Sequence, residues 1–314
     1  IHLTSEREEL KGGLPSFILF DSLDARIHLS ERDRMHMNYS HYGDIGADGT
    51  YTEGEIRKME MTQTGEFIAD GLRMEMDIEA VKVKDHLYIT ASGGNRTTEM
   101  ILALADSTRY AYIALTGDRC HIYDVSIERE ETETPEEGQK RLVDELNFID
   151  GPEGDVPNVQ INGWREKASQ AIPIKESLDL SFHMKSLPMA RLVWHLPFVL
   201  IFSADDAQVR GKNYREFASV RFDGEAWQED AMSHNRLIIN KTEAFTGWDE
   251  WKAENKKGRD CKLTITRNGN QFTMITACGG IELNNLTTIE GEIPELYFAF
   301  TGDQCVIENI RILK

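Results

Sequence analysis

One short sequence occurs twice in this chain, and the repeat constrains its fold more than any other feature. "YIALTGDRCHIYDV" spans 112–125 and "YFAFTGDQCVIENI" spans 297–310, an offset of 185 residues. Three more matches follow in the same order. "LPSFILFDSLDARI" matches "LPFVLIFSADDAQV", and one Thr-Gly pair matches another, both at an offset of 182 residues. "ITASGG" matches "ITACGG" at an offset of 186 residues. Four anchors in one order predict an internal duplication of domain-sized units, not a short solenoid repeat.

The repeated phrase predicts a hairpin in each unit, with an apolar strand, a Thr-Gly-Asp turn and a strand that starts at Cys. Cys120 and Ile122 keep a period of two, after which the apolar set jumps to Val125. The second copy repeats the jump between Ile307 and Ile310. A phase slip shared by both copies predicts a β-bulge in each.

A second hairpin is predicted in "CKLTITRNGNQFTMITAC", where Asn268 and Gly269 suit the two central positions of a type I′ turn. This turn would place four apolar residues on one face: Leu263, Ile265, Phe272 and Met274. It would also place Cys261 opposite Thr276, which disfavours a disulfide between Cys261 and Cys278. No CxxC pair occurs, so zinc and redox chemistry are weakly indicated and a reducing, cytoplasmic compartment is favoured.

Helical patterns are rare. "TPEEGQKRLVDELNFIDG" offers Thr134 as an N-cap and Pro135 in the first turn, and it predicts a helix in an acidic connection. "WDEWKAENKKG" predicts a short helix that ends at Gly258. The chain therefore reads as all-β, with two tandem jelly-roll or β-sandwich domains joined by a short helical linker. The expected boundaries are 1–130 for the first sandwich, 131–158 for the linker and 159–314 for the second sandwich.

Composition excludes several functional classes. The 314 residues carry a formal charge of −19, which disfavours attraction to nucleic acid or to an anionic membrane and suits a cation or a neutral ligand. No apolar run approaches the roughly 18 residues that span a bilayer. Because residue 1 is Ile and not Met, we expect a piece of a longer protein, whose upstream part could hold a catalytic domain.

The run "GWDEWKAENKKGRDCKLTITRNGN", followed later by "ELYFAFTGDQCVIENIRIL", resembles the lectin-like jelly-roll modules at the C-terminal end of some bacterial multidomain signalling proteins. Some of these proteins are headed by a His-Asp (HD) phosphohydrolase domain. The general pattern also resembles concanavalin-like and laminin G-like sandwiches. The resemblance implies a sandwich framework and carries no ligand residues with it. The His-Asp dipeptide of the phosphohydrolase does not occur in this chain.

One candidate site is the loop "DIGADGTYTEGE", which fits much of a twelve-residue calcium loop. Its candidate calcium ligands are Asp44, Asp48, Thr50 and Glu55. Position 3 of the template is a glycine without a side-chain oxygen, and no convincing helices flank the loop, so a polar hairpin turn is the favoured alternative. The second unit has no matching loop, and "FDGEAW" is its nearest phrase.

The other candidate site is formed by tryptophans, because a flat aromatic ring can stack on the apolar face of a sugar. Trp227 follows Asp223 and Glu225, and Trp194 lies beside another expected strand of the same unit. These four residues are the candidate sugar contacts, and packing in a core or at a sheet edge is the commoner role of such a Trp.

The sequence contains no Gly-x-Ser-x-Gly motif of serine hydrolases, no His-Glu-x-x-His motif of zinc enzymes and no glycine loop that binds phosphate. We therefore expect a non-catalytic region that binds a carbohydrate or senses another neutral ligand. Two alternatives remain open. One is an accessory or dimerisation region of an HD-type phosphohydrolase, and the other is a sandwich-fold glycoside hydrolase that uses Asp223 and Glu225.

Overall fold

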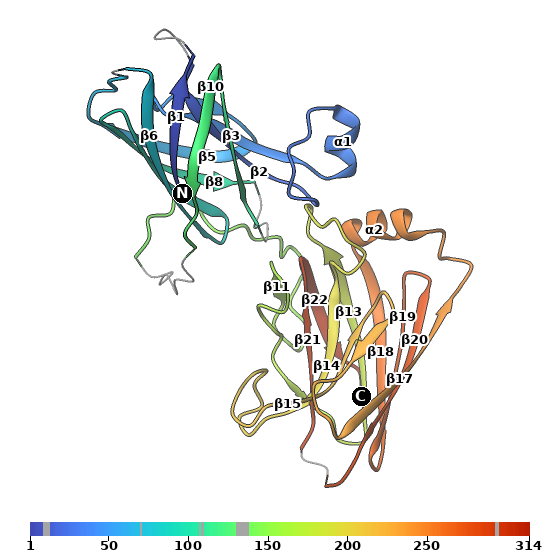
Figure 1. Ribbon diagram of the computed structural model, residues 1–314. Helices are drawn as coiled ribbons and strands as arrows, with labels where there is room; N and C mark the ends of the chain where they lie inside the picture. Colours follow the sequence, from blue (N-terminus) through green and yellow to red (C-terminus); the bar gives the residue numbers. More distant parts are fainter. Residues whose placement is uncertain (9–12, 70, 106, 108–109, 130–137, 293–294) are drawn as a thin grey trace. The chain divides into compact units, whose positions relative to one another are not determined.

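The computed structural model describes the chain except for residues 9–12, 70, 106, 108–109, 130–137 and 293–294. The chain forms two compact units, Ile1–Leu146 and Asn147–Lys314, which we call the N-terminal sandwich and the C-terminal sandwich. Each unit packs two antiparallel sheets around its own apolar core (Figure 1). The predicted all-β fold with two tandem sandwiches is confirmed.

The N-terminal sandwich has ten strands and one short helix in its described residues. They are β1 (His2–Arg7), β2 (Pro15–Asp21), α1 (Glu31–His36), β3 (Ser40–Gly46), β4 (Tyr51–Glu53), β5 (Ile56–Thr64), β6 (Arg73–Val83), β7 (His86–Gly93), β8 (Arg96–Leu104), β9 (Tyr112–Gly117) and β10 (Cys120–Ser126). The strand orders are β10-β1-β6-β7-β8-β5 in one sheet and β4-β3-β2-β9 in the other.

The C-terminal sandwich has twelve strands and one helix in its described residues. They are β11 (Val159–Ile161), β12 (Ile172–Pro173), β13 (Ser177–Ser186), β14 (Pro197–Ser203), β15 (Arg215–Arg221), β16 (Glu225–Trp227), β17 (Ser233–Lys241), α2 (Trp248–Lys257), β18 (Arg259–Asn268), β19 (Gln271–Cys278), β20 (Ile281–Ile289), β21 (Tyr297–Gly302) and β22 (Cys305–Ile312). The strand orders are β11-β22-β13-β18-β19-β20-β17 and β12-β21-β14-β15-β16.

Strand order confirms the duplication. If β1 to β10 are matched in turn with β13 to β22, both sheets of the first unit map onto both sheets of the second without a change of neighbour. The second unit adds the edge strands β11 and β12, and its helix α2 lies between β17 and β18, whereas α1 lies between β2 and β3. Both copies also have an irregularity in the register at the same place, between Leu19 and Phe20 in one and between Ile201 and Phe202 in the other.

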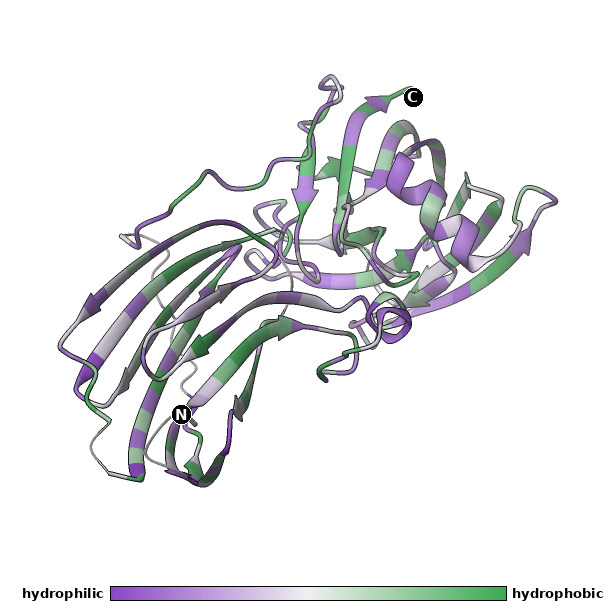
Figure 2. Ribbon diagram, turned by 90° about the horizontal axis from the view of Figure 1, so that it is seen from above, coloured by the Kyte–Doolittle hydropathy of each residue, from purple (hydrophilic) through white to green (hydrophobic). Residues whose placement is uncertain are grey.

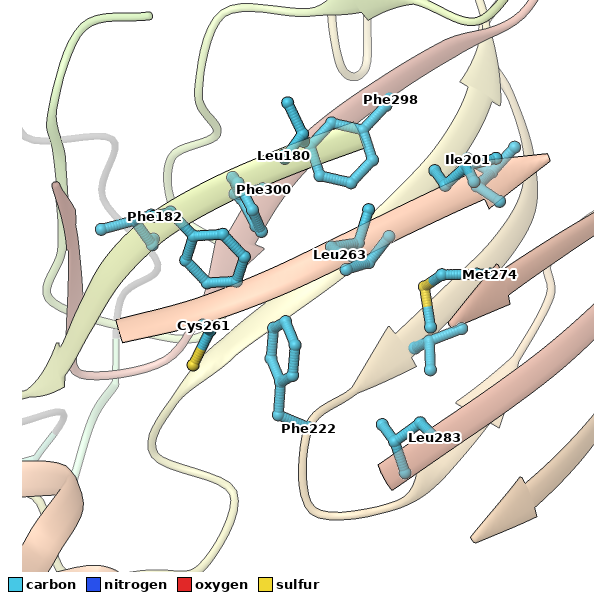
Figure 3. Packing of buried hydrophobic residues seen from close by; sticks show 14 of the residues in the cluster. Leu180, Phe182, Ile201, Phe222, Cys261, Leu263, Met274, Leu283, Phe298 and Phe300 are labelled. Carbon is cyan, nitrogen blue, oxygen red and sulfur yellow. The ribbon is translucent and has the colours of Figure 1, made fainter. Parts of the chain in front are cut away.

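Alternating side chains from the two facing sheets fill each core. In β13 every second residue is buried, and in β18 Cys261, Leu263 and Ile265 are buried while their neighbours face outward. Figure 2 shows this alternation as changes between green and purple along the strands. Phe182 of β13, Phe300 of β21 and Phe222 of the turn after β15 lie together in the C-terminal core (Figure 3).

The repeated Thr-Gly-Asp phrase does not form a hairpin, so that prediction is wrong. β9 pairs with β2 in one sheet, whereas β10 pairs with β1 in the other, and the second copy does the same. The phrase therefore carries the chain from one sheet to the other. Gly117 is required because a Cβ there would lie 2.4 Å from the sulfur of Cys120, and Gly302 has the same relation to Cys305.

The predicted bulge is confirmed in both copies. The register of β10 on β1 shifts between His2 and Thr4, and that of β22 on β13 shifts between Ser181 and His183. The residue that absorbs the extra step is left-handed in each copy, with a φ of 49° at Asp124 and at Asn309. Short polar side chains tolerate this conformation better than most residues do.

The hairpin of β18 and β19 has a different turn from the one predicted, and this overturns the cysteine assignment. Asn268 pairs with Gln271, so the central residues are Gly269 and Asn270, and of these only Gly269 has a positive φ (59°). Glycine at the first central position is the requirement of a type II′ turn. The new register brings Cys261 opposite Cys278, and the two form a disulfide with their Cα atoms 5.2 Å apart.

The disulfide removes the sequence argument for a reducing compartment, because disulfides persist mainly in oxidising ones. The turn moved by one residue, so each cross-strand partner moved by two. Side-chain direction has a period of two along a strand, so every residue kept its predicted face. The cysteine pairing changed although the predicted apolar face is correct.

The "ITASGG" and "ITACGG" anchors also sit one residue out of structural register. Ile89 is buried in β7, whereas Ile275 is half exposed on the outer face of β19. Matching buried faces gives an offset of 185, which aligns Gly93 with Cys278 and Met76 with Cys261. Met76 and Gly93 are paired across β6 and β7. The N-terminal sandwich therefore has a Met-Gly pair where the C-terminal sandwich has its disulfide.

The predicted helical linker is wrong for its described part, because residues 138–151 contain no helix; residues 130–137 lie outside the described chain. Tertiary contacts replace helical bonds here. The Arg141 guanidinium lies 2.7 Å from the buried Asp85 carboxylate, and the backbone N–H of Leu142 donates to His86 Nε2 at 3.1 Å. Residues 138–146 thus pack on the N-terminal sandwich, whereas the backbone N–H groups of Phe148 and Asp150 donate to Gln160 and Glu308 of the C-terminal sandwich.

The helix predicted in "WDEWKAENKKG" is confirmed as α2, which is capped at its C-terminal end by Gly258 with a φ of 88°. Trp251 packs inward and is buried, while Trp248 stands at the rim with its ring centroid 5.6 Å away. No helix in the part of the chain that the structure describes is long and apolar enough to cross a membrane.

Candidate functional site

Both candidate sites predicted from the sequence occupy the same hairpin in the two copies. Strand pairing places the β15–β16 hairpin where the first copy has β3–β4, so "FDGEAW" is the structural equivalent of the loop with Asp48. The prediction that the second unit has no matching loop is therefore wrong. Both turns contain Asp-Gly, and both glycines have a positive φ, 77° at Gly49 and 103° at Gly224.

Arg221 is the centre of the site in the C-terminal sandwich. It ends β15, where it is paired with Phe198 on one side and Glu225 on the other. Its Nε and Nη2 donate to the two Asp223 oxygens at 2.9 and 2.7 Å, a bidentate contact. The same Nη2 lies 2.9 Å from the Glu225 carboxylate. In the first copy this position is Gly46.

Aromatic rings surround the guanidinium. Its central carbon lies 5.7 to 5.9 Å from the ring centroids of Trp194, Phe198 and Trp227, within the range of cation–π attraction. Trp164 stacks on Trp227 with centroids 6.2 Å apart and planes 13° from parallel. It also meets Phe198 edge-on at 4.9 Å. The result is one aromatic cluster on the outer side of the five-stranded sheet.

The two carboxylates of the cluster have different surroundings. The side chain of Asp223 is 6% exposed, and burial raises its pKa although the bonds from Arg221 act in the opposite direction. Glu225 is 66% exposed and presents its carboxylate to solvent. With one cation and two carboxylates, the cluster carries no spare positive charge. The cluster can offer a ligand carboxylate oxygens that accept from hydroxyl groups, and aromatic faces for stacking.

All four predicted sugar contacts lie in this cluster: Trp194, Asp223, Glu225 and Trp227. The sequence analysis missed Arg221, Phe198 and Trp164. Phe198 belongs to the buried strand β14, and its side chain lies on the outer side of that strand. An arginine two residues before an Asp-Gly turn was the available signal for Arg221, because such spacing puts both side chains on one strand face.

The candidate calcium ligands do not come together as a calcium site. Asp48 Oδ1 accepts from the backbone N–H and the hydroxyl of Thr50, at 3.0 and 2.7 Å, and these two side chains fold over Gly46. Asp44 lies 3.5 Å from His41, and Glu55 is exposed. Among the described residues, no group of three His, Cys, Asp or Glu side chains is arranged to hold a metal. The arrangement is that of a polar hairpin turn.

We expect Asp48→Ala to destabilise this hairpin by about 1 kcal/mol, since it removes two hydrogen bonds of ordinary strength. Hydrogen exchange at the Thr50 amide measures the effect, with the exposed Asp118→Ala as the control. Added calcium should leave the exchange rate unchanged. Protection that rises with calcium and is lost in Asp48→Ala would restore the calcium-site interpretation.

A buried histidine adjoins the aromatic cluster. His195 follows Trp194 and is 6% exposed, and its Nδ1 accepts from the backbone N–H groups of Arg191 and Leu192 at 2.9 and 3.4 Å. Burial, together with the charges of Arg191 and Lys256, lowers the pKa of His195 to about 4. Asp303 lies 3.7 Å from Nε2 and would favour protonation. Because both N–H donors need an unprotonated Nδ1, the neutral ring is the form that fits.

No family model matches the chain, and no curated protein matches it. Among solved structures it is similar to Bacteroides ovatus Xyloglucan PUL GH43B, at 9% identity and a TM-score of 0.25, over 87% of this chain and 60% of that one. It is also similar to the fructofuranosidase from Schwanniomyces occidentalis complexed with fructose, at 10% identity and a TM-score of 0.23, over 98% and 59%. The chain thus spans about 60% of their length, and likenesses this weak carry no argument.

Proposed function

We propose that the C-terminal sandwich is a non-catalytic module that binds a neutral glycan at the Arg221 cluster. The observation that carries this proposal is the stack of Trp164 on Trp227 beside an exposed carboxylate. Trp164 remains 38% exposed while its stacked and edge-on contacts hold the ring in place. A fixed, exposed aromatic face suits the apolar side of a pyranose.

Polar groups beside that face provide orientation. Glu225 is bound to Arg221 through one oxygen and keeps its remaining acceptor positions open to solvent. Arg221 itself is held by two carboxylates and three aromatic rings, so little side-chain entropy is lost when a ligand binds. One guanidinium faces two carboxylates, so the cluster has no positive charge left to attract an anion, and this favours neutral hydroxyl groups over anionic ones.

Titration with neutral gluco-, xylo-, manno-, galacto- and fructo-oligosaccharides tests the proposal. All five tryptophans lie in the C-terminal sandwich, so tryptophan fluorescence reports on this unit alone. We expect Trp164→Ala to weaken binding about tenfold, the loss of one aromatic stacking contact. Trp248→Ala is the matched control, because Trp248 is 36% exposed and belongs to α2. Absence of binding across the panel, or equal losses in both variants, would refute the proposal.

Hydrolysis is a second candidate, because Asp223 and Glu225 bind one nitrogen of Arg221 and burial raises the pKa of Asp223. A raised pKa on one of two neighbouring carboxyls is the pattern of a glycosidase. However, both Asp223 oxygens accept from Arg221, which favours the ionised form and opposes a role as general acid. Turnover of an oligosaccharide that is lost in Glu225→Gln would establish the activity.

A further inference from the structure

A second polar site lies in the C-terminal sandwich, between helix α2 and the β19–β20 turn. Arg259 opens β18 just after α2, and it is half-buried. No carboxylate in the described chain forms an ion pair with it, although acidic residues outnumber basic ones by 54 to 35. The charge of Glu254 raises the pKa of Arg259 from a distance, but the Glu254 carboxylate itself forms an ion pair with Lys257 at 2.5 Å.

The donors of this site have no adequate acceptor among the described residues. Arg259 Nε is buried without a partner, and Nη2 makes one long bond of 3.4 Å to the carbonyl oxygen of Trp251. Trp251 is 3% exposed, and its indole N–H is also unpaired. Its Nε1 lies 3.0 Å, and Arg259 Nη1 1.3 Å, from the point where a Cβ on Gly279 would be. The guanidinium and the unpaired indole N–H therefore lie close together over one glycine.

In the first copy, the described residues place an aromatic ring and no guanidinium over the equivalent glycine. Gly94 and Asn95 form the matching turn, and like Gly279 and Gly280 both residues have positive φ. The point above Gly94 is covered by the Phe67 ring, 2.8 Å from a Cβ placed there. The same register aligns Arg259 with a methionine, Met74, which is buried in the first core.

The comparison of the copies shows that the fold itself does not require a cation here. Arg259 stays protonated, because an arginine cannot lose its proton under ordinary conditions, although burial lowers its pKa. Asn255, one turn along α2 from Trp251, is also buried with its amide oxygen unpaired. Its amide can present either an oxygen or two N–H donors. The site therefore holds a partly buried cation and donors that the described residues leave mostly without an acceptor.

We propose that this site binds a small oxyanion, a carboxylate, sulfate or phosphate group, through the Arg259 guanidinium and the Trp251 indole N–H. Hydrogen bonds from a charged guanidinium to an oxyanion are among the stronger ones in proteins. The anion would supply the acceptor that both donors lack. The site is separate from the Arg221 cluster, so it does not depend on glycan binding there.

Binding is measured by calorimetry and thermal shift with sodium sulfate, sodium phosphate and sodium glucuronate, each against sodium chloride at matched ionic strength. We expect a saturable response to at least one oxyanion. Response to sulfate or phosphate alone identifies an inorganic or ester group as the ligand, and response to glucuronate identifies a carboxylate. Absence of any saturable response beyond chloride would overturn the proposal.

Three variants locate the response. Arg259→Met installs the residue of the first copy, so the unliganded fold should persist while anion affinity falls about tenfold or more. Trp251→Phe keeps an aromatic side chain but removes the pyrrole half of the indole with its N–H donor, and it should weaken binding severalfold. Arg236→Gln removes an exposed arginine on β17 and should change nothing. Full affinity in Arg259→Met, or equal losses in Arg259→Met and Arg236→Gln, would contradict the proposed site.

Discussion

Replacing both cysteines of the disulfide, Cys261→Ala with Cys278→Ala, is expected to lower the free energy of unfolding of the C-terminal sandwich by about 3 kcal/mol. The bridge closes a loop with a sequence separation of 17 residues, and the loss of that constraint on the unfolded chain accounts for a change of this size. Urea unfolding followed by tryptophan fluorescence measures it in the C-terminal sandwich alone.

Two further measurements separate the bridge from simple packing. Under denaturing, non-reducing conditions the protein should show two free thiols, Cys120 and Cys305, and four after reduction. Cys120→Ala lies in the N-terminal sandwich and should leave the tryptophan transition in place. Four reactive thiols before reduction would show that Cys261 and Cys278 are not joined.

The second large effect is a loss of stability of the C-terminal sandwich on acidification, caused by His195. The folded protein binds a proton at this ring only below about pH 4, whereas the unfolded chain binds it below about pH 6.5. Between these values the unfolded state binds more protons, so stability falls as the pH falls from about 6.5 to 4. The pKa difference corresponds to about 3 kcal/mol over that window.

His195→Gln removes the titrating group and keeps an oxygen that can accept from the backbone N–H of Arg191. We expect its stability to change less than that of the native protein between pH 6.5 and 4. Carboxylates titrate in the same range, so the comparison is between variants and not between pH values alone. His234→Gln, an exposed histidine beside Glu290, is the control. Parallel pH profiles for His195→Gln and the native protein would exclude His195 as the cause.

The candidate sites were predicted in part, and their geometry explains the limits. Asp223, Glu225 and Trp227 are close in sequence, and alternation along a hairpin suffices to group them. Trp164 reaches the cluster from a segment outside the hairpin, and no local pattern reports that approach. The cationic centre was missed for a similar reason, since Arg221 becomes central only when separate strands bring aromatic rings around it.

The Arg259 site was not predicted at all. Its members lie on α2, β18 and the β19–β20 turn, and what distinguishes them is the absence of partners. Hydrogen-bond satisfaction is a property of the folded environment, so no sequence pattern contains it. Met74 and Phe67 correspond to this site only when the buried faces of the two copies are matched, at an offset of 185. The matching "ITA" letters have an offset of 186 and would place a buried residue of one copy on an outward-facing residue of the other.

The sequence alone determined the duplication, the β-structure of each copy, the shared bulge and helix α2, because these depend on local periodicity and on turn or capping residues. Tertiary structure decided which strands pair, that the repeated phrase joins two sheets, and that residues 138–151 pack without a helix. It also decided the disulfide. A turn displaced by one residue leaves every side chain on its face but moves each partner by two, and periodicity cannot detect that displacement.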